Sequence, residues 1–248
     1  MRSYGEQAVA EFVGTLALVF IGAGSVVILS QVAGGAAVLG IAIAHGLVLG
    51  IMVTNLGHIS GGHFNPAVTV GAWVAGKIET SRASLYVVTQ LAGATAGAGL
   101  LRWALPERLW RPSSLGATLV AHRVNITNGK AVLIEAVLTF FLVFTVFATA
   151  IDDRGAFKSI AGFGIGLVLT FDILVGGVLT GASMNPARTF GPALVAGKWT
   201  DFWVYVAGPL TGGIIAAALY WFAFLRSREV SAPRSETQIG GGPEEDLS

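Results

Sequence analysis

The sequence predicts an all-α membrane protein with six transmembrane helices, two re-entrant half-helices and an internal inverted repeat. Three observations predict this fold class. Long blocks of the chain carry almost no charge, the tripeptide Asn-Pro-Ala occurs twice behind glycine-containing segments, and the two halves of the chain resemble each other. The first observation predicts the spans, the second the half-helices and the third their inverted arrangement.

The spans follow from the low charge density. Only 12% of the 248 residues are charged, whereas soluble domains carry about 25%. The apolar residues form blocks of the length that a helix needs to cross a bilayer, about 20 residues. A chain of this length could not bury six such helices in a soluble core, so a soluble protein is excluded. We expect transmembrane helices at residues 6–29, 36–56, 82–105, 130–151, 159–179 and 201–225.

Composition also indicates how the chain begins and ends. The first apolar block is longer than the core of a signal peptide, and no cleavage site follows it, so we expect a retained helix. Residues 229–248 are polar and rich in Gly and Pro, which predicts a disordered tail. Six helices place both termini on one side, and the basic residues slightly favour the cytoplasm for that side. There is no cysteine, which excludes disulfides and thiol chemistry.

The two halves of the chain, about 6–105 and 130–225, repeat each other. "AEFVGTLALVF" resembles "IEAVLTFFLVF", and "HISGGHFNPAVTVG" resembles "LTGASMNPARTFG". Glu11 therefore aligns with Glu135, and Asn65 aligns with Asn185. An odd number of helices in each half gives the second half the opposite topology. Inverted repeats of this kind place a membrane protein's site near the midplane, where broken helices meet.

The Asn-Pro-Ala segments read as helix starts. Asn is a favoured N-cap, and Pro is favoured at the first helical position because its missing N–H costs nothing there. The helix expected at 66–75 has ten residues, about 15 Å at 1.5 Å per residue, which is too short to span. Two half-helices entering from opposite faces would complete one span. Non-helical backbone at that depth is tolerated where it lines a wet cavity or is buried in protein.

These residues carry a resemblance to a known family. The two Asn-Pro-Ala motifs, in "SGGHFNPAVT" and "NPARTFGP", together with a Glu in the first and fourth helices, resemble the aquaporin (major intrinsic protein) family over residues 6–225. Among subfamilies, "GASMNPARTFGPALV" looks most like the tonoplast intrinsic proteins, and bacteria also carry such water channels. The resemblance implies an aquaporin-like right-handed bundle, with residues 1–228 as the channel domain.

The resemblance also implies roles for individual residues. The two half-helices would meet at mid-bilayer, where the Asn amides donate to a file of water and the helix dipoles repel protons and cations. Glu11 and Glu135 would accept hydrogen bonds from the loops rather than contact the permeant. The Asn-Pro-Ala residues are Asn65, Pro66, Ala67, Asn185, Pro186 and Ala187, and the implied pore-lining loop residues are Gly61, Gly62, His63, Gly181 and Ser183.

A narrower filter toward the outside is implied at four positions, His45, Ile173, Ala182 and Arg188. Strict water channels of the family carry a second His where Ile173 stands, so the filter is similar to those that pass ammonia as well as water. His122, in the outer loop, matches a further His that lies beside the filter in such members. The alternative for His122 is an exposed loop residue.

The resemblance implies a passive channel for water, ammonia and other small neutral solutes that excludes protons and ions, with no cofactor and no metal. It implies a homotetramer in a lipid bilayer, in the cell membrane of a prokaryote or the vacuolar membrane of a plant, with no nucleic-acid partner. Two alternatives stay open, a glycerol or small-polyol facilitator and a coupled secondary transporter. No nucleophile–base constellation points to an enzyme. The role of Asp172 and any glycosylation at Asn125 stay open.

Overall fold

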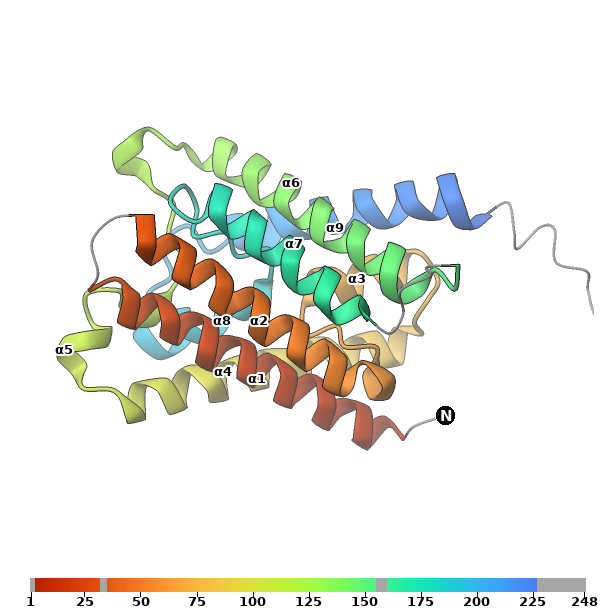
Figure 1. The fold of residues 1–248 in the computed structure, drawn as a ribbon, viewed down its shortest axis with the longest axis horizontal. Helices are drawn as coiled ribbons and strands as arrows, with labels where there is room; N and C mark the ends of the chain where they lie inside the picture. Colours follow the sequence, from red (N-terminus) through yellow and green to blue (C-terminus); the bar gives the residue numbers. More distant parts are fainter. Residues whose placement is uncertain (1–2, 32–34, 155–159, 227–248) are drawn as a thin grey trace, which may run out of the picture.

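The computed structural model describes residues 3–31, 35–154 and 160–226, and the predicted tail at 229–248 lies outside them. Within the described residues the regular structure is helical and contains no strand (Figure 1). The long helices are α1 (Tyr4–Leu29), α2 (Gly35–Ser60), α4 (Thr80–Ala104), α6 (Asn128–Val146), α7 (Ala161–Gly176) and α9 (Val204–Tyr220). The short elements are α3 (Pro66–Val74), α5 (Glu107–Trp110), α8 (Pro186–Ala196), the 3-10 turns Ser114–Gly116 and His122–Val124, and the π-helical turns Phe147–Ile151 and Trp221–Leu225.

Five of the long helices, all except α7, are long and apolar enough to cross a membrane. The sixth, α7, has 16 described residues, which is about 24 Å at 1.5 Å per residue. It lies along α2 (Figure 1). The predicted architecture of six spans and two half-helices is confirmed. The helix at 36–56 was expected to end earlier, but helical hydrogen bonds continue until the Gly61 N–H meets the Gly57 carbonyl at 2.8 Å.

The long helices pack in pairs through small residues. Helix α1 packs along α4, α2 along α7, and α6 along α9. A Cβ atom added at Gly50 of α2 would lie 2.7 Å from the carbonyl oxygen of Gly162 in α7, and Gly46 faces Gly166 in the same way. These glycines, spaced four residues apart on each helix, permit the backbones to approach closely, as is typical of helices in lipid.

Each half-helix begins at its Asn-Pro-Ala motif. Asn65 has extended backbone, and its side chain accepts a hydrogen bond from the Ala67 N–H (2.8 Å). Asn185 accepts from the N–H groups of Ala187 (3.0 Å) and Arg188 (3.1 Å). Pro stands at the first helical position in both. Asn therefore caps each helix as the sequence predicts.

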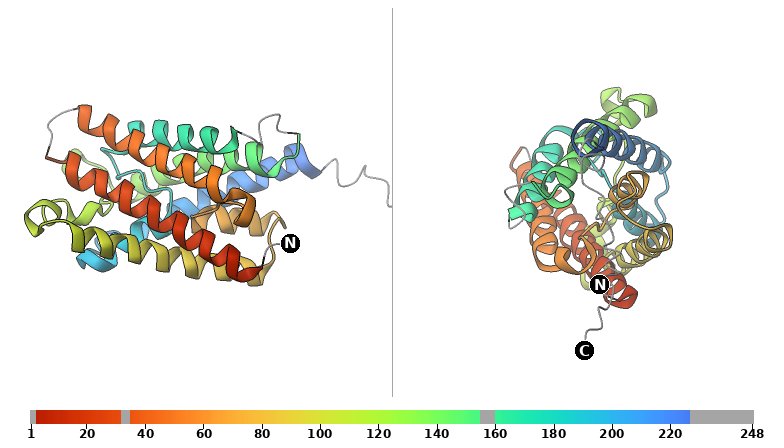
Figure 2. Two further views of the ribbon diagram at one scale, coloured as in Figure 1. Left: turned by 60° about the horizontal axis from the view of Figure 1, so that its bottom comes forward. Right: turned by 90° about the vertical axis from the view of Figure 1, so that its right-hand side faces the viewer.

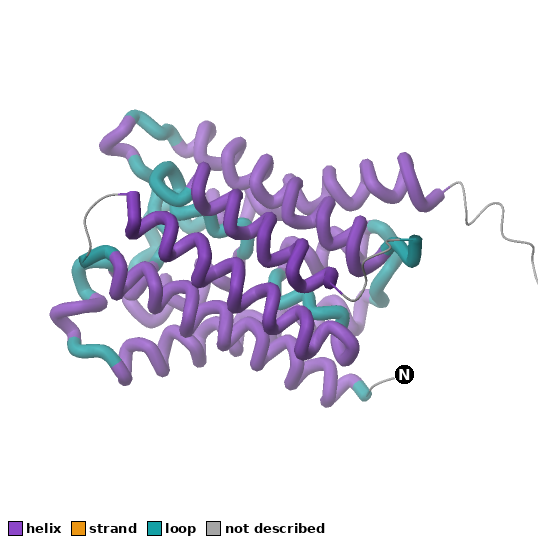
Figure 3. Tube along the Cα trace, in the orientation of Figure 1, coloured by secondary structure: helices purple, strands orange, loops and turns teal. Residues whose placement is uncertain are grey.

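The half-helices enter from opposite ends of the bundle (Figure 2). Seen end-on, the helices form a ring, and the loops that lead into α3 and α8 run through its middle (Figures 2 and 3). Helix α1 begins and helix α9 ends at one end of the molecule, while α5 lies at the other (Figure 1). The ring encloses the two places where the helical backbone is interrupted.

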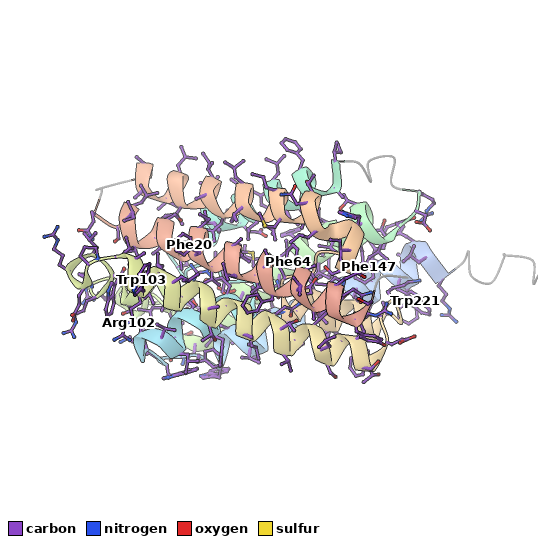
Figure 4. The ribbon with its side chains drawn as sticks, turned by 90° about the horizontal axis from the view of Figure 1, so that it is seen from below. Phe20, Phe64, Arg102, Trp103, Phe147 and Trp221 are labelled. Atoms are coloured by element: carbon purple, nitrogen blue, oxygen red, sulfur yellow. The ribbon has the colours of Figure 1, made fainter. Side chains whose placement is uncertain are left out.

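Aromatic side chains mark the two ends of the bundle and its centre. Trp103 lies beside Arg102 near the α5 end, and Trp221 lies near the opposite end (Figure 4). Trp103 is 86% exposed, as expected of a tryptophan at a membrane interface. Phe64 lies between the two ends, fully buried, with its ring against Gly14 of α1.

Candidate functional site

The carboxylate of Glu11 holds the loop that enters α3. Glu11 lies in α1 and is fully buried. Its Oε1 accepts hydrogen bonds from the Ser60 hydroxyl (2.6 Å) and the His63 N–H (3.0 Å). Its Oε2 accepts from the Phe64 N–H (2.7 Å) and the Gln90 side-chain amide (2.7 Å). A buried carboxylate needs such donors, and the loop needs an acceptor for its N–H groups, so each satisfies the other.

Glu135 does the same for the loop that enters α8. It lies fully buried in α6. Its Oε1 accepts from the Thr180 hydroxyl (2.6 Å) and the Ser183 N–H (3.0 Å), and its Oε2 accepts from the Met184 N–H (2.8 Å). The structure thus brings both predicted supporting carboxylates to the loops they were expected to hold.

Three supporting residues were missed by the sequence reasoning. The Tyr86 hydroxyl donates to the Ser60 carbonyl (2.7 Å), and the Tyr205 hydroxyl donates to the Thr180 carbonyl (2.6 Å). Gln90 bonds Glu11 as described above. The two tyrosines stand 119 residues apart, close to the offset of the motifs, and this spacing was the signal that could have found them.

The backbone of both loops enters the left-handed region. In the first loop, Gly61 and Gly62 have φ values of 92° and 67°. In the second loop, Gly181 has a φ of 85°, but Ala182 stands where Gly62 would align and has a φ of 44°. An alanine in this region is strained. The hydrogen bonds to the buried carboxylates hold the loops in this conformation.

The two Asn-Pro-Ala motifs meet through reciprocal hydrogen bonds. The Asn65 side-chain amide donates to the Met184 carbonyl (2.8 Å), and the Asn185 amide donates to the Phe64 carbonyl (2.9 Å). Each amide has two N–H groups, so a second one remains on each side chain. Both asparagines line one internal cavity, together with Gly62, His63 and Ser183. The predicted Asn pair therefore comes together at the centre of the bundle.

His45 and Arg188 form a contact at the α5 end of this cavity. The His45 Nδ1 lies 2.9 Å from the Ile41 carbonyl, which can only accept, so Nδ1 carries the proton. The Arg188 Nη2 lies 3.3 Å from His45 Nε2, which therefore accepts. Arg188 Nη1 donates to the Gly116 carbonyl (2.8 Å). His45 is thus a neutral imidazole beside a buried guanidinium.

The other two predicted filter residues lie nearby. Ile173 of α7 is buried and lines a cavity at the α5 end together with Arg188 and Gly181. Ala182 is buried, and its Cβ lies beside Gly176, one helical turn after Ile173. The structure brings His45, Ile173, Ala182 and Arg188 to one region.

Three neighbouring cavities lie along the bundle. The cavity at the α5 end has a volume of about 200 Å³. The central cavity offers only about 20 Å³ to the centres of water molecules, little more than one water needs. At the other end lies a cavity of about 340 Å³. Arg188 lines the first two and His63 the last two, so the spaces follow one another along the bundle.

His122 lies apart from this set. Its Nδ1 is 2.9 Å from the Ile126 carbonyl, and its Nε2 is 2.7 Å from Asp201 Oδ2. The Asn128 amide donates to the other Asp201 oxygen (2.9 Å). His122 is exposed, and its ring is engaged in the outer loops rather than with Arg188 or His45.

Asp172 is the buried acidic residue whose role the sequence left open. It is 1% exposed, and neither carboxylate oxygen has a hydrogen-bond partner among the described residues. The same part of the chain contains no group of three or more His, Asp or Glu placed to hold a metal ion. The structure gives no physical account of Asp172.

Comparisons with known proteins agree with this geometry. The major intrinsic protein family matches residues 2–220. Aquaporin TIP4-4 of Zea mays is 44% identical over 237 residues, which covers 93% of this chain and 91% of the relative. Aquaporin-2 of Rattus norvegicus is 40% identical over 244 residues, which covers 98% of this chain and 88% of the relative.

A solved structure shows the same fold. The aquaglyceroporin of Plasmodium falciparum superposes with a TM-score of 0.80 over 92% of this chain and 100% of that chain. The two sequences are only 22% identical, so this likeness concerns the fold alone.

Proposed function

Since this chain belongs to the major intrinsic protein family and is an aquaporin-type channel of the membrane, not an enzyme, we propose that it conducts water in single file and passes ammonia and other small neutral solutes. The proposal further holds that protons and ions are excluded.

One observation carries this proposal. Asn65 and Asn185 meet reciprocally, each with one side-chain N–H used by the opposite loop, and both line a central cavity with room for little more than one water. The second N–H of each amide is then available to a water molecule in that cavity. A water whose oxygen accepts from both sides points its hydrogens away from the centre along the pore.

Proton exclusion follows from this orientation and from charge. The N-termini of α3 and α8 face each other at the two asparagines, and each carries roughly half a positive charge. A cation at this point would be repelled from both sides. A proton relay needs each water to donate to the next, and waters oriented oxygen-first at the centre interrupt the relay.

The proposed filter combines one polar and one apolar wall. Neutral His45 and charged Arg188 form a polar side whose donors come from Arg188, while Ile173 and Ala182 offer an apolar side. The fixed charge of Arg188 repels cations. A small neutral molecule with an acceptor atom, such as water or ammonia, suits this set, and an ion does not.

The other candidates have less support. A coupled transporter needs titratable groups or ion ligands at the midplane, and the two motifs present neutral amides there. The small volume of the central cavity, about 20 Å³, favours water over a molecule as large as glycerol. It remains the alternative among channels.

The proposal also includes the assembly and the membrane. We propose a homotetramer in a lipid bilayer, with one pore in each subunit and both ends of the chain on the cytoplasmic side. That membrane is the cell membrane if the source is a prokaryote and the vacuolar membrane if it is a plant.

Purified protein in liposomes tests the solute range. Stopped-flow measurements would follow water, ammonia, urea and glycerol in vesicles with and without protein. We expect protein-dependent water and ammonia fluxes that do not saturate, with glycerol far below both. Gradient-coupled or saturating flux would instead indicate a transporter, and glycerol flux comparable to water would indicate the facilitator.

A further inference from the structure

The hydrogen bonds of His122 define its charge. Its two ring nitrogens face the Ile126 carbonyl (2.9 Å) and a carboxylate oxygen of Asp201 (2.7 Å). Both partners are acceptors, because a carbonyl cannot donate and an ionised carboxylate cannot either. A neutral imidazole carries a single N–H, so it can make only one of these bonds. Both bonds together require the imidazolium.

The imidazole of His45 has the opposite kind of partners. One nitrogen faces the Ile41 carbonyl, and the other faces the guanidinium of Arg188, which can only donate. These partners require a neutral ring. Two histidines at the α5 end thus have opposite charge requirements, and only His122 is exposed to solvent at a position where its proton can exchange freely.

The bonded ring joins two loops that are far apart in the sequence. His122 belongs to the segment between α5 and α6, and Asp201 belongs to the turn between α8 and α9. Asp201 has a φ of 53°, a left-handed conformation that a non-glycine residue rarely adopts. Its second oxygen accepts from Asn128 at the start of α6. The carboxylate is therefore fixed between His122 and Asn128.

The segment that His122 fixes, residues 113–127, contacts Arg188 of the filter directly and two neighbours of the filter residues. The Gly116 carbonyl accepts from Arg188 (2.8 Å). The Thr118 hydroxyl lies 2.9 Å from that of Thr189, the next residue of α8. The Ala121 N–H donates to the Leu179 carbonyl (2.9 Å), in the loop that leads to Ala182. We name residues 113–127 the outer strap.

We propose that His122 and Asp201 are positioning residues for the filter: when His122 is protonated they hold the outer strap against Arg188, and when it is neutral the strap loosens and the filter admits larger neutral solutes. This proposal rests on the proposed channel function and deepens it. It makes the solute range of the pore depend on whether His122, which lies outside the pore, is protonated.

The charge around His122 gives the direction of the pH dependence. Asp201 is the charged group that faces the ring, while α6 contributes the neutral amide of Asn128 and the strap contributes the Ile126 carbonyl. The hydrogen bond to Asp201 raises the pKa of His122 above its ordinary value of 6.5. The strap is therefore held below this raised pKa, and one of the two bonds is lost as the pH rises through it.

The test is the ratio of urea to water permeability in liposomes between about pH 6 and pH 9, a range that brackets histidine titration. Both solutes are neutral throughout. For the unaltered protein we expect the ratio to rise with pH by about fivefold, the lower end of coupling between linked sites. His122→Ala should give the high ratio at every pH. His122→Lys, which stays charged and can donate to both acceptors, should give the low ratio at every pH.

A further variant separates this role from a merely structural one. Asp201→Asn keeps a residue type that tolerates left-handed backbone but removes the charge, so it should move the midpoint of the pH profile to lower pH. Two controls should keep the original profile: Arg123→Ala, beside His122 on the same exposed turn, and His58→Ala, at the opposite mouth.

The outcomes are distinct. A urea-to-water ratio that is flat with pH in the unaltered protein overturns the proposal, and so does a His122→Ala variant that keeps the original profile. In both cases water permeability itself would remain. Absence of protein-dependent water permeability at every pH would instead contradict the proposed function.

Discussion

The first half of the chain places four hydrogen-bond donors on the carboxylate of Glu11, whereas the second half places three on that of Glu135. The extra donor is Gln90 of α4. Tyr86 and Tyr205 stand 119 residues apart, and at the same spacing the counterpart of Gln90 is Pro209 in α9. Proline has no side-chain amide that could donate. The two halves share a scaffold but support it differently.

A second difference lies directly after the motifs. Asn-Pro-Ala is followed by Val68 in the first half and by Arg188 in the second. Only the second half therefore places a charge beside the pore, at the α5 end where His45 and Gly116 receive it. We propose that the repeated residues form the passage and that departures from the repeat, such as Arg188, set the solute range. The first two predictions below alter these differences, the third concerns a further difference, and the last tests a feature that the halves share.

The largest effect is expected from removing the supporting carboxylates. Glu135→Gln places an amide against the Met184 N–H and leaves that donor unsatisfied. We expect a loss of about 3 kcal/mol in the free energy of unfolding and little water permeability. Glu11→Gln should cost about 1 kcal/mol less, because Gln90 can turn its unpartnered oxygen toward the new amide.

Thermal unfolding in detergent, with water flux in liposomes, would compare these variants. The control is Glu11→Gln combined with Gln90→Ala, which should remove the difference between the halves. Equal losses for the two single variants would show that Gln90 does not compensate.

The next effect concerns solute range. Arg188→Val places the same residue after the second motif as after the first. It removes the guanidinium that donates to the Gly116 carbonyl and to His45. We expect urea and glycerol permeability to rise about tenfold or more, an energy difference of about 1.4 kcal/mol, while water permeability is kept. Val70→Leu, in α3 but outside the residues that line the central cavity, is the control and should leave the solute range unchanged. If urea and glycerol permeability stay low in Arg188→Val, Arg188 does not set the solute range.

A smaller effect is expected at the end of α6. Asp152, directly after the π-helical turn Phe147–Ile151, accepts hydrogen bonds from Arg154 and Tyr220. At the spacing that relates Glu11 to Glu135, the counterparts of Asp152 and Arg154 in the first half are Ile28 and Ser30, which cannot form such a pair. The Arg154 guanidinium lowers the pKa of Asp152 from its ordinary value of 3.8. A group with a lowered pKa stabilises the fold above its unfolded pKa, and this contribution is lost as the pH falls below 3.8 through the folded pKa.

Asp152→Asn should therefore lower the melting temperature at pH 7 and reduce its fall under acid conditions. Melting curves of both proteins between about pH 2 and pH 7 would show this as a difference that is constant above pH 3.8 and narrows below it. Parallel curves would mean that the pair adds nothing to the stability of this end.

The smallest effect is expected from the tyrosine hydroxyls. Tyr86→Phe and Tyr205→Phe each remove a donor to a loop carbonyl, at 2.7 Å and 2.6 Å. Each should cost about 1 kcal/mol of stability. Because the two bonds are alike in both halves, melting temperatures of the two variants should fall by similar amounts. A much larger fall for one of them would show that its loop depends on that hydroxyl alone.

Local signals explain what the sequence predicted. The Asn caps, the Pro after them and the apolar blocks act within a few residues, so they located the half-helices and the spans. The repeat aligned Glu11 with Glu135, and the family resemblance implied that each carboxylate holds a loop. The hydrogen bond between His122 and Asp201 could not be predicted, because the two residues are 79 positions apart and no local pattern near His122 indicates its partner. The functional roles of the filter residues stay predictions.

The most direct test of the central claim measures osmotic water flux and proton flux in the same vesicles. The account predicts fast water flux with an activation energy close to that of free diffusion, and a proton flux equal to that of empty vesicles. A proton flux that rises in proportion to the water flux would contradict it, because the paired asparagines would then fail to interrupt the file of water.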